Sequence, residues 1–328
     1  CQLELMVKSN RIVRANGVEA LKPNDGRLCV KGRFGYDFVA SRQRLTQPLI
    51  RQGGKLQPAT WDEALGLIAE RFTTIRDTHG GDALAGYASA KATNEDNYLF
   101  QKFIRTAFGT NNVDYCTRLC HASTVTAMLS ALGSGAGANS IEDYAEADCI
   151  LVTGNNMVET HPVTATFVKQ SLAKGGRLIL IDPRRTPLAD HAHVWLQPRL
   201  GTDIAMLNGL IHLVIQEGLV DTTFVEARVA GGREALAALA ALAADYPPAA
   251  VEAITGIPQG KLLTAARTFA RAEKALIATG MGCSQQVTGT HLVYSLINLC
   301  LITGQIGKAG AGINPPRGQN NVQGVSDV

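Results

Sequence analysis

The fold is decided by residues 149–159, CILVTGNNMVE, in which four apolar residues are followed by a polar, glycine-containing turn. A short apolar run that ends in turn residues predicts a buried strand, here 149–152. The same pattern predicts strands at 178–181, 194–196 and 275–278. A buried sheet therefore forms the centre of this chain.

Helical segments alternate with these strands between residues 116 and 319. They are predicted at 163–174, 204–217 and 292–303, each followed by a glycine that can end a helix. Alternation of strands and helices predicts parallel strands with helices on both faces. We therefore expect an α/β fold with a doubly wound parallel sheet.

Polar turns follow all four predicted strands, where parallel sheets bind ligands. They begin at Gly154, Asp182, Gly201 and Gly280. Helix N-termini attract phosphate, and a strand-end Asp accepts hydrogen bonds from ribose or guanine, so a nucleotide-containing cofactor is expected. The alternative is ordinary turns, which use the same residue types. The sequence has neither GxGxxG nor a Walker A motif, which excludes the standard NAD and ATP fingerprints.

The segment before residue 116 has a different pattern. Alternating apolar residues from Leu3, interrupted at Asn16-Gly17, predict a small antiparallel unit. A helix is predicted from Trp61, because Thr60 and Glu63 have the spacing of a capping box.

Composition limits the function classes. The chain has 328 residues, enough for about two domains, and a net charge of +3, which gives no electrostatic reason to expect nucleic acid or an anionic membrane as partner. No apolar run approaches the roughly 20 residues of a membrane span. The chain begins at Cys1 and ends at Val328 after a turn-rich run, so we expect a segment of a longer protein.

Seven cysteines without regular spacing indicate reduced thiols and a cytoplasmic location. Cys149 and Cys300 fall in apolar segments and are expected in the core. Cys120 lies beside Arg118 and His121, whose positive charge would favour the metal-binding thiolate form. On spacing alone, a buried structural cysteine is the favoured interpretation of Cys120.

Six motifs carry a family resemblance over the whole chain. The sequence resembles the molybdopterin oxidoreductases, and within them the catalytic subunit of molybdenum or tungsten formate dehydrogenases. The motifs are LCVKG at 28–32, WDEA at 61–64, RLCH at 118–121, IDPR at 181–184, GMG at 280–282 and PRGQNNVQG at 316–324.

The resemblance implies an iron-sulfur site near the N-terminus. In the family, a CxxCxxxC run and a later cysteine hold a 4Fe-4S cluster by their thiolates. Cys1 matches the third cysteine of the run and Cys29 the later one, which leaves two ligands upstream of this sequence. Lys31 would then lie between the cluster and a pterin.

The resemblance also implies a molybdenum or tungsten centre held by two molybdopterin guanine dinucleotides. Cys120 matches the metal ligand, and a soft, high-valent metal suits a thiolate. His121, Arg317 and Gln319 match residues of the formate site, where the guanidinium of Arg317 would orient the carboxylate. The expected contacts to the dinucleotide arms are Asn156, Glu159, Asp182, Arg184, Gly201, Asp203, Met281, Gly282 and Gln285.

The implied domains are a partial, β-rich 4Fe-4S domain at 1–42 and the first part of a second α/β domain at 43–115. A Rossmann-like, dinucleotide-binding domain carrying the metal ligand follows at 116–319, and residues 320–328 begin the return to the second domain.

The implied function is reversible oxidation of formate to carbon dioxide, with electrons passing to the 4Fe-4S cluster. Electron-transfer partner subunits are expected, among them flavin-containing, NAD-linked ones. Nitrate reductase or another oxo-transfer enzyme is the alternative, against which His121 and Arg317 argue. A non-catalytic electron-transfer or structural relative is the other alternative.

Overall fold

The computed structural model describes residues 1–137 and 139–328 and divides into two compact units. The sheet unit comprises Leu21–Asp25 and Leu119–Gly318. The hairpin unit comprises Cys1–Ala20, Gly26–Arg118 and Gln319–Val328. Each is described by itself.

A five-stranded parallel sheet forms the centre of the sheet unit. Its order is β11-β10-β7-β8-β9, and every neighbouring pair is parallel. The chain winds outward from β7 first in one direction and then in the other, so a topological switch point lies between β7 and β10. The strands are β7 (Cys149–Thr153), β8 (Arg177–Ile181), β9 (Val194–Leu196), β10 (Ala275–Thr279) and β11 (Gly312–Asn314).

The four predicted strands are confirmed as β7 to β10. The sequence did not predict β11, because its three residues include a glycine and an asparagine and make no apolar run. The predicted helices are found as α8 (Pro162–Ala173), α9 (Asp203–Gln216) and α15 (Gly289–Ile302).

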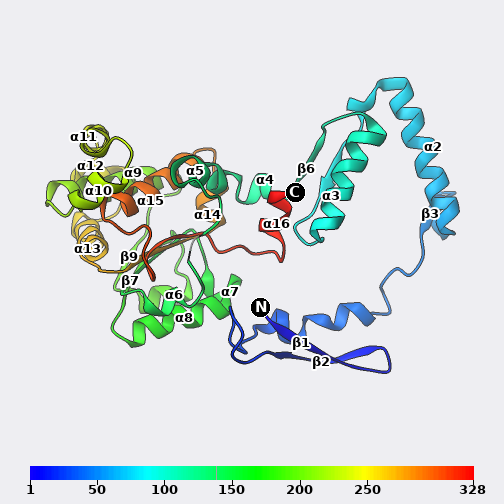
Figure 1. The fold of residues 1–328 in the computed structure, drawn as a ribbon, viewed down its shortest axis with the longest axis horizontal. Helices are drawn as coiled ribbons and strands as arrows, with labels where there is room; N and C mark the ends of the chain where they lie inside the picture. The colour runs from blue at the N-terminus through cyan, green and yellow to red at the C-terminus, as the bar shows by residue number, and fades with distance from the viewer. Residues whose placement is uncertain (138) are drawn as a thin grey trace. The chain divides into compact units, whose positions relative to one another are not determined.

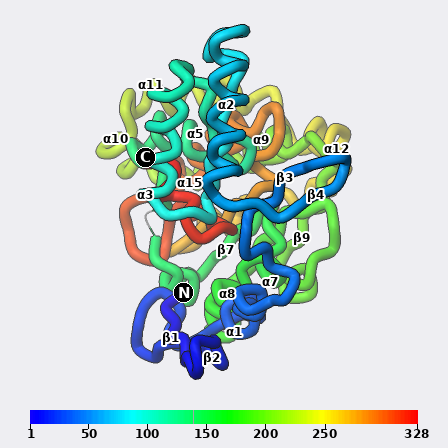
Figure 2. Tube along the Cα trace, turned by 90° about the vertical axis from the view of Figure 1, so that its right-hand side faces the viewer, coloured from blue at the N-terminus to red at the C-terminus, as the bar shows by residue number. Residues whose placement is uncertain are grey.

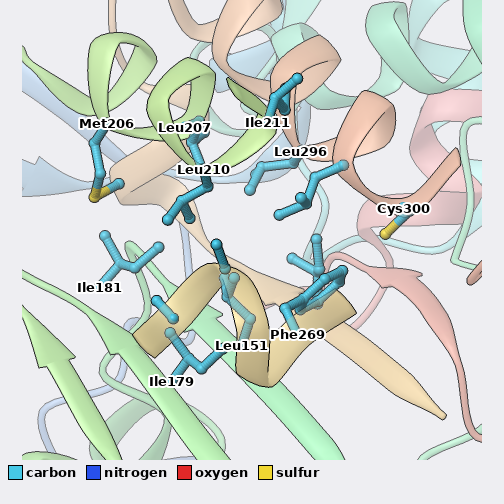
Figure 3. Packing of buried hydrophobic residues seen from close by; sticks show 14 of the residues in the cluster. Leu151, Ile179, Ile181, Met206, Leu207, Leu210, Ile211, Phe269, Leu296 and Cys300 are labelled. Atoms are coloured by element: carbon cyan, nitrogen blue, oxygen red, sulfur yellow. The ribbon is translucent and has the colours of Figure 1, made fainter. Parts of the chain in front are cut away.

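Both faces of the sheet are buried under helices. Along β7, Leu151 belongs to the main core cluster, whereas its neighbours Ile150 and Val152 are fully buried on the other face. Helices α9, α13 (Gln259–Ala270) and α15 lie on one side of the strands, with α8 on the opposite side (Figure 1). Figure 3 shows Phe269 of α13 beside Leu151 and Ile179 of the sheet.

Shorter elements complete the sheet unit. They are α5 (Ala122–Leu132), α6 (Asp143–Glu146), α7 (Met157–Thr160), η4 (Pro187–His191), α10 (Thr222–Arg228), α11 (Gly232–Ala243), α12 (Pro248–Thr255) and α14 (Met281–Ser284), while α4 (Thr117–Cys120) spans the boundary between the units.

The hairpin unit begins with two antiparallel strands, β1 (Leu3–Lys8) and β2 (Arg11–Gly17). The predicted antiparallel unit is confirmed, but the predicted break at Asn16-Gly17 is wrong. The turn is at Ser9-Asn10, which both have positive φ, as a tight hairpin turn requires. Gly17 allows a close backbone approach instead. A Cβ at this position would lie 2.0 Å from the carbonyl oxygen of Gly26.

A second hairpin leads into a long helix, as Figure 2 shows for β3, β4 and α2. The capping box at the start of α2 is confirmed: Glu63 N–H donates to Thr60 Oγ1 at 3.2 Å, and Thr60 N–H donates to Glu63 Oε2 at 2.8 Å. No residue of α2 is fully buried. The helix still packs on a small core, because Ile75 contacts the cluster of Leu84, Ile104 and Phe108. The elements are β3 (Leu49–Gln52), β4 (Lys55–Pro58) and α2 (Trp61–His79).

The last residues of the chain pack within the hairpin unit. Val322 and Val325 of α16 (Val322–Asp327) form a small cluster with Ala90, and Asn321 N–H donates to Ala90 O at 2.9 Å. The other elements of this unit are α1 (Val30–Phe34), η1 (Gly35–Ala40), η2 (Gly81–Ala83), β5 (Gly86–Ala88), α3 (Asn94–Phe103), η3 (Ile104–Phe108) and β6 (Val113–Tyr115). Within residues 1–137 and 139–328, no helix has the length and apolar character of a membrane span.

Candidate functional site

Three glycines bring two loops into backbone contact at the switch point. Gly282 N–H donates to Gly154 O at 3.0 Å. A Cβ on Gly282 would lie 2.6 Å from Gly154 Cα, and a Cβ on Gly280 would lie 2.5 Å from Gly154 O. Gly154 also has a positive φ of 60°. Side chains at these positions would push apart the loops that follow β7 and β10.

A pocket of about 490 Å³ opens at the carboxyl end of the sheet, on the β8 side of this contact. Its volume is within the range of sites for nucleotide-sized ligands. Gln286 lines it where the sequence suggested Gln285, and Glu159 and Met281 are not among its lining residues. Six residues predicted as cofactor contacts line it: Asn156, Asp182, Arg184, Gly201, Asp203 and Gly282.

The polar groups of this pocket are set up for a ligand with hydrogen-bond donors. Asn156 Oδ1 is buried and accepts no hydrogen bond from the described residues. Asp182 Oδ1 accepts from Arg184 N–H at 2.8 Å, which fixes the turn after β8. Burial raises the pKa of Asp203, and the negative charge of Asp182 raises it further. Hydrogen bonds from the Asp203 backbone and from Gln286 lower this pKa but do not cancel the rise.

Cys120 is the last residue of α4, and His121 follows it as the N-cap of α5, close to α14. Ser284 Oγ donates to Cys120 O at 2.5 Å and so ties this segment to the loop after β10. The Cys120 side chain is half-buried, whereas His121 is almost fully buried. Burial, reinforced by the positive charges of Arg317 and His161, lowers the pKa of His121 to about 4, so its imidazole is neutral at neutral pH.

The expected positive surroundings of Cys120 differ from those in the structure. His121 is neutral at neutral pH. Within the hairpin unit, the guanidinium of Arg118 forms an ion pair with Asp114 at 2.8 Å. Burial disfavours the protonated form of His121, and the carboxylate of Asp114 neutralises the charge of Arg118. Neither effect can be seen from the order of these residues in the sequence.

Arg317 lies in the loop after β11 and is anchored twice. Its Nη2 donates to Gly135 O at 2.8 Å, and its backbone oxygen is 2.9 Å from His161 Nε2. Gly135 belongs to the loop that ends α5, the helix that begins after His121. The sheet unit therefore brings Arg317 and His121 together, close enough for the guanidinium to lower the pKa of the imidazole.

The remaining predicted site residues belong to the hairpin unit. Cys29 is the N-cap of α1, which contains Lys31, and Cys1 is exposed. Cys116 Sγ donates to Gln319 Oε1 at 3.4 Å. Within the described chain, no three His, Cys, Asp or Glu side chains gather in the geometry of a metal site.

Sequence reasoning missed His161, Gln286 and Ser284. Each lies within seven residues of a predicted site position, yet nothing in the local pattern distinguishes it from an ordinary loop residue. Their roles arise from contacts with distant segments. The burial predicted for Cys149 and Cys300 is confirmed.

Comparison with protein families gives two matches that together cover most of the chain. The profile of the molybdopterin oxidoreductases matches residues 44–326. The profile of the molybdopterin oxidoreductase Fe4S4 domain matches residues 1–41.

Curated proteins match over the whole chain. The F420-dependent formate dehydrogenase subunit alpha of Methanocaldococcus jannaschii is 42% identical over 328 residues, which are 100% of this chain and 47% of that protein. Formate dehydrogenase H of Escherichia coli is 40% identical over 335 residues, covering 100% of this chain and 46% of that protein. The chain thus spans about half the length of the curated relatives it matches.

Among solved structures, acetylene hydratase from Pelobacter acetylenicus has the same fold. The TM-score is 0.80 at 26% sequence identity, and the match covers 94% of this chain and 42% of that chain.

Proposed function

Because the chain belongs to the molybdopterin oxidoreductase family, with an Fe4S4 domain at its N-terminus, we propose that it is part of the catalytic subunit of a formate dehydrogenase. The proposed reaction converts formate to carbon dioxide, a proton and two electrons, and is reversible. The observation that carries this proposal is the cluster of Cys120, a neutral His121 and Arg317 within one unit. The identity of about 40% to formate dehydrogenases supports it.

The substrate roles follow from the chemistry of these side chains. The planar guanidinium of Arg317 suits a carboxylate, so it would bind formate through both oxygens. His121 Nδ1 is buried and has no hydrogen-bond partner among the described residues. This nitrogen would accept the proton that formate releases, and its low pKa would make it pass the proton on.

The pocket residues would hold a guanine dinucleotide arm of the pterin cofactor. Asn156 Oδ1 lacks a donor within the described chain, and Asp182 and Asp203 supply carboxylate oxygens for the N–H groups of a guanine edge. Glu159, Met281 and Gln285 remain proposed contacts of this or the second arm. Cys120 would hold the molybdenum or tungsten through its thiolate. When bound, this centre supplies the two-electron redox chemistry.

The described residues do not complete a cluster site. A 4Fe-4S cluster takes four thiolate ligands, of which Cys1 and Cys29 supply two. The family match at residues 1–41 supports a cluster in this part of the protein, and Lys31 and Gln319 are proposed to lie beside the cofactor. We assign no catalytic step to the cluster.

The location, the partner subunits and the domain division of the protein are proposed as well. We propose a cytoplasmic location, because none of the seven cysteines, all of which lie in the described residues, forms a disulfide. Electron-transfer partner subunits would accept the electrons, and flavin-containing, NAD-linked subunits have the required chemistry. The domain scheme of 1–42, 43–115, 116–319 and 320–328 is proposed to describe how the chain divides in the whole protein.

The test uses the full-length catalytic subunit, purified with its partner subunits. We expect bound molybdenum or tungsten by metal analysis, and reduction of an artificial electron acceptor that depends on formate. Nitrate and acetylene serve as competing substrates. Nitrate reduction or acetylene hydration without formate oxidation, or clean folding with neither metal, would refute the proposal.

A further inference from the structure

His161 connects two loops of the sheet unit that are 156 residues apart in the sequence. Its Nε2 lies 2.9 Å from the backbone oxygen of Arg317. A carbonyl oxygen can only accept, so Nε2 carries the hydrogen and donates it to Arg317 O. The contact therefore holds the backbone of the Arg317 loop, while Gly135 O holds the end of its side chain.

The position of His161 is itself set by two helices. It lies between α7 and α8. Its backbone N–H donates to Met157 O at 2.8 Å, and its backbone oxygen accepts from Ala165 N–H at 3.0 Å. Pro162 follows directly and restricts the backbone of the residue before it. The imidazole therefore projects from a fixed base.

The second ring nitrogen continues the connection toward the switch point. Thr160 Oγ1 lies 2.8 Å from His161 Nδ1, 3.0 Å from Asn156 O and 3.2 Å from Asn155 Oδ1, and its single hydrogen serves one acceptor at a time. Asn155 Nδ2 donates at 3.1 Å to the backbone oxygen of Thr279, which is the last residue of β10. A chain of polar contacts thus runs from the ends of β7 and β10 to the Arg317 loop.

We propose that His161 is a positioning residue, which fixes the Arg317 backbone so that the guanidinium meets the substrate carboxylate at the correct place. The inference rests on the proposed function, because it takes Arg317 as the residue that binds formate. A flexible Arg317 loop would weaken substrate binding before it slowed the chemistry. The loss of His161 should therefore raise the KM for formate more than it lowers kcat.

The test compares two substitutions in the intact holoenzyme. The amide nitrogen of His161→Gln can take the place of Nε2 and donate to Arg317 O, whereas the shorter amide of His161→Asn reaches only as far as Nδ1. We expect the Asn variant to raise the KM for formate by about tenfold or more, and the Gln variant to remain close to the parent. Metal content and thermal unfolding should be the same in both.

Hydrogen exchange gives a readout that does not depend on turnover. The amides of residues 316–319 should exchange faster in the Asn variant than in the Gln variant, with the exchange of α8 unchanged. Measured on metal-free protein, this comparison holds even if a variant does not load metal. The matched control is His212→Leu, which removes the contact of His212 Nδ1 to Ala243 O at 3.0 Å and should leave the KM unchanged.

Equal KM and equal loop exchange in the Asn and Gln variants would overturn the role of His161. If the parent enzyme itself does not oxidise formate, the proposed function fails. In that case, faster exchange in the Asn variant alone would still support the anchoring of the loop, so the two failures are distinguishable.

Discussion

Burial separates the four cysteines of the sheet unit by their chemistry. Cys149 and Cys300 are fully buried among apolar side chains, which raises the pKa of each thiol far above its usual range. Burial raises the pKa of Cys283 to about 11. Cys120 is the least buried of the four. Its thiol is therefore the most accessible of the four, and its role as a metal ligand stays a prediction from the sequence motif.

Substitution of the proposed site residues should separate function from stability. We expect Cys120→Ala and Arg317→Ala each to lower formate turnover of the holoenzyme roughly a hundredfold or more, because a metal ligand or a charged substrate contact is lost. Cys300→Ala should keep turnover and lower the free energy of unfolding by about 1 kcal/mol, since it removes one small buried group. Steady-state kinetics and urea unfolding measure the two effects. Near-normal turnover in all three variants would contradict the assignments.

Asp203 should make the stability of the cofactor-free protein depend on pH. Its pKa is raised in the folded chain, so its contribution is present below the unfolded value of 3.8 and is lost as the pH rises through the folded pKa. Asp203→Asn should therefore stabilise the metal-free protein at neutral pH and reduce the loss of stability that occurs as the pH rises above 3.8. Urea unfolding measures this, with the exposed Asp245→Asn as control. Parallel curves for Asp203→Asn and the parent would count against it.

At the scale of elements, local sequence predicts how helices begin more reliably than how loops meet. Thr60 and Glu63 make a capping box whose partners are three residues apart, so the motif is visible in the sequence. The contact of Gly154 with Gly282 joins loops from two separate strands. The sequence identified its glycines as turn residues. It did not show that their backbones touch, because this depends on β7 and β10 being neighbours in the sheet.

The switch-point contact predicts a cost for any side chain there. Gly282→Ala would put a Cβ 2.6 Å from Gly154 Cα, and backbone must move to admit it. We expect a loss of about 1–3 kcal/mol in the free energy of unfolding, together with a lower metal content of the purified holoenzyme. Gly260→Ala, where a Cβ would meet nothing within 4 Å, is the control and should leave both unchanged or raise stability slightly. Equal effects of the two substitutions would argue against the contact.

The capping box predicts a local effect on α2. Thr60→Ala removes the acceptor for Glu63 N–H and should destabilise the first turn by about 1 kcal/mol. Hydrogen exchange at the Glu63 amide should accelerate accordingly. Thr74→Ala, in the middle of the same helix, keeps the box intact and is the control. An unchanged Glu63 exchange rate in Thr60→Ala would show that the cap does not stabilise this turn.

At the scale of the molecule, one continuous core joins the sheet to α9, α13 and α15. Leu210 of α9 and Leu296 of α15 face the layer of Leu151 and Ile179 with Phe269 (Figure 3). Sequence periodicity identified α9, α15 and the strands β7 to β10, but not α13, which lies between α9 and β10, where the sequence carried no prediction. The core thus holds the strand ends, and with them the pocket, in place.

Loss of the central aromatic ring should destabilise the sheet unit. Phe269 has 0% exposure, and Phe269→Ala should lower the free energy of unfolding by about 3–5 kcal/mol because it leaves a large cavity. Calorimetric or urea unfolding of the protein measures the loss. Val287→Ala, at a fully exposed position, should change stability by less than about 0.5 kcal/mol. A comparable loss in both variants would mean that α13 is not part of the cooperative core.

The sequence by itself determined the buried strands β7 to β10, the helices α8, α9 and α15, the capping box and the core cysteines. These features depend on neighbours within a few residues, whose periodicity is visible along the chain. The tertiary structure alone decided that β11 joins the sheet, that His121 is neutral, and that His161 meets Arg317. Those outcomes depend on burial and on contacts between segments up to 156 residues apart, which only the order of the strands brings together.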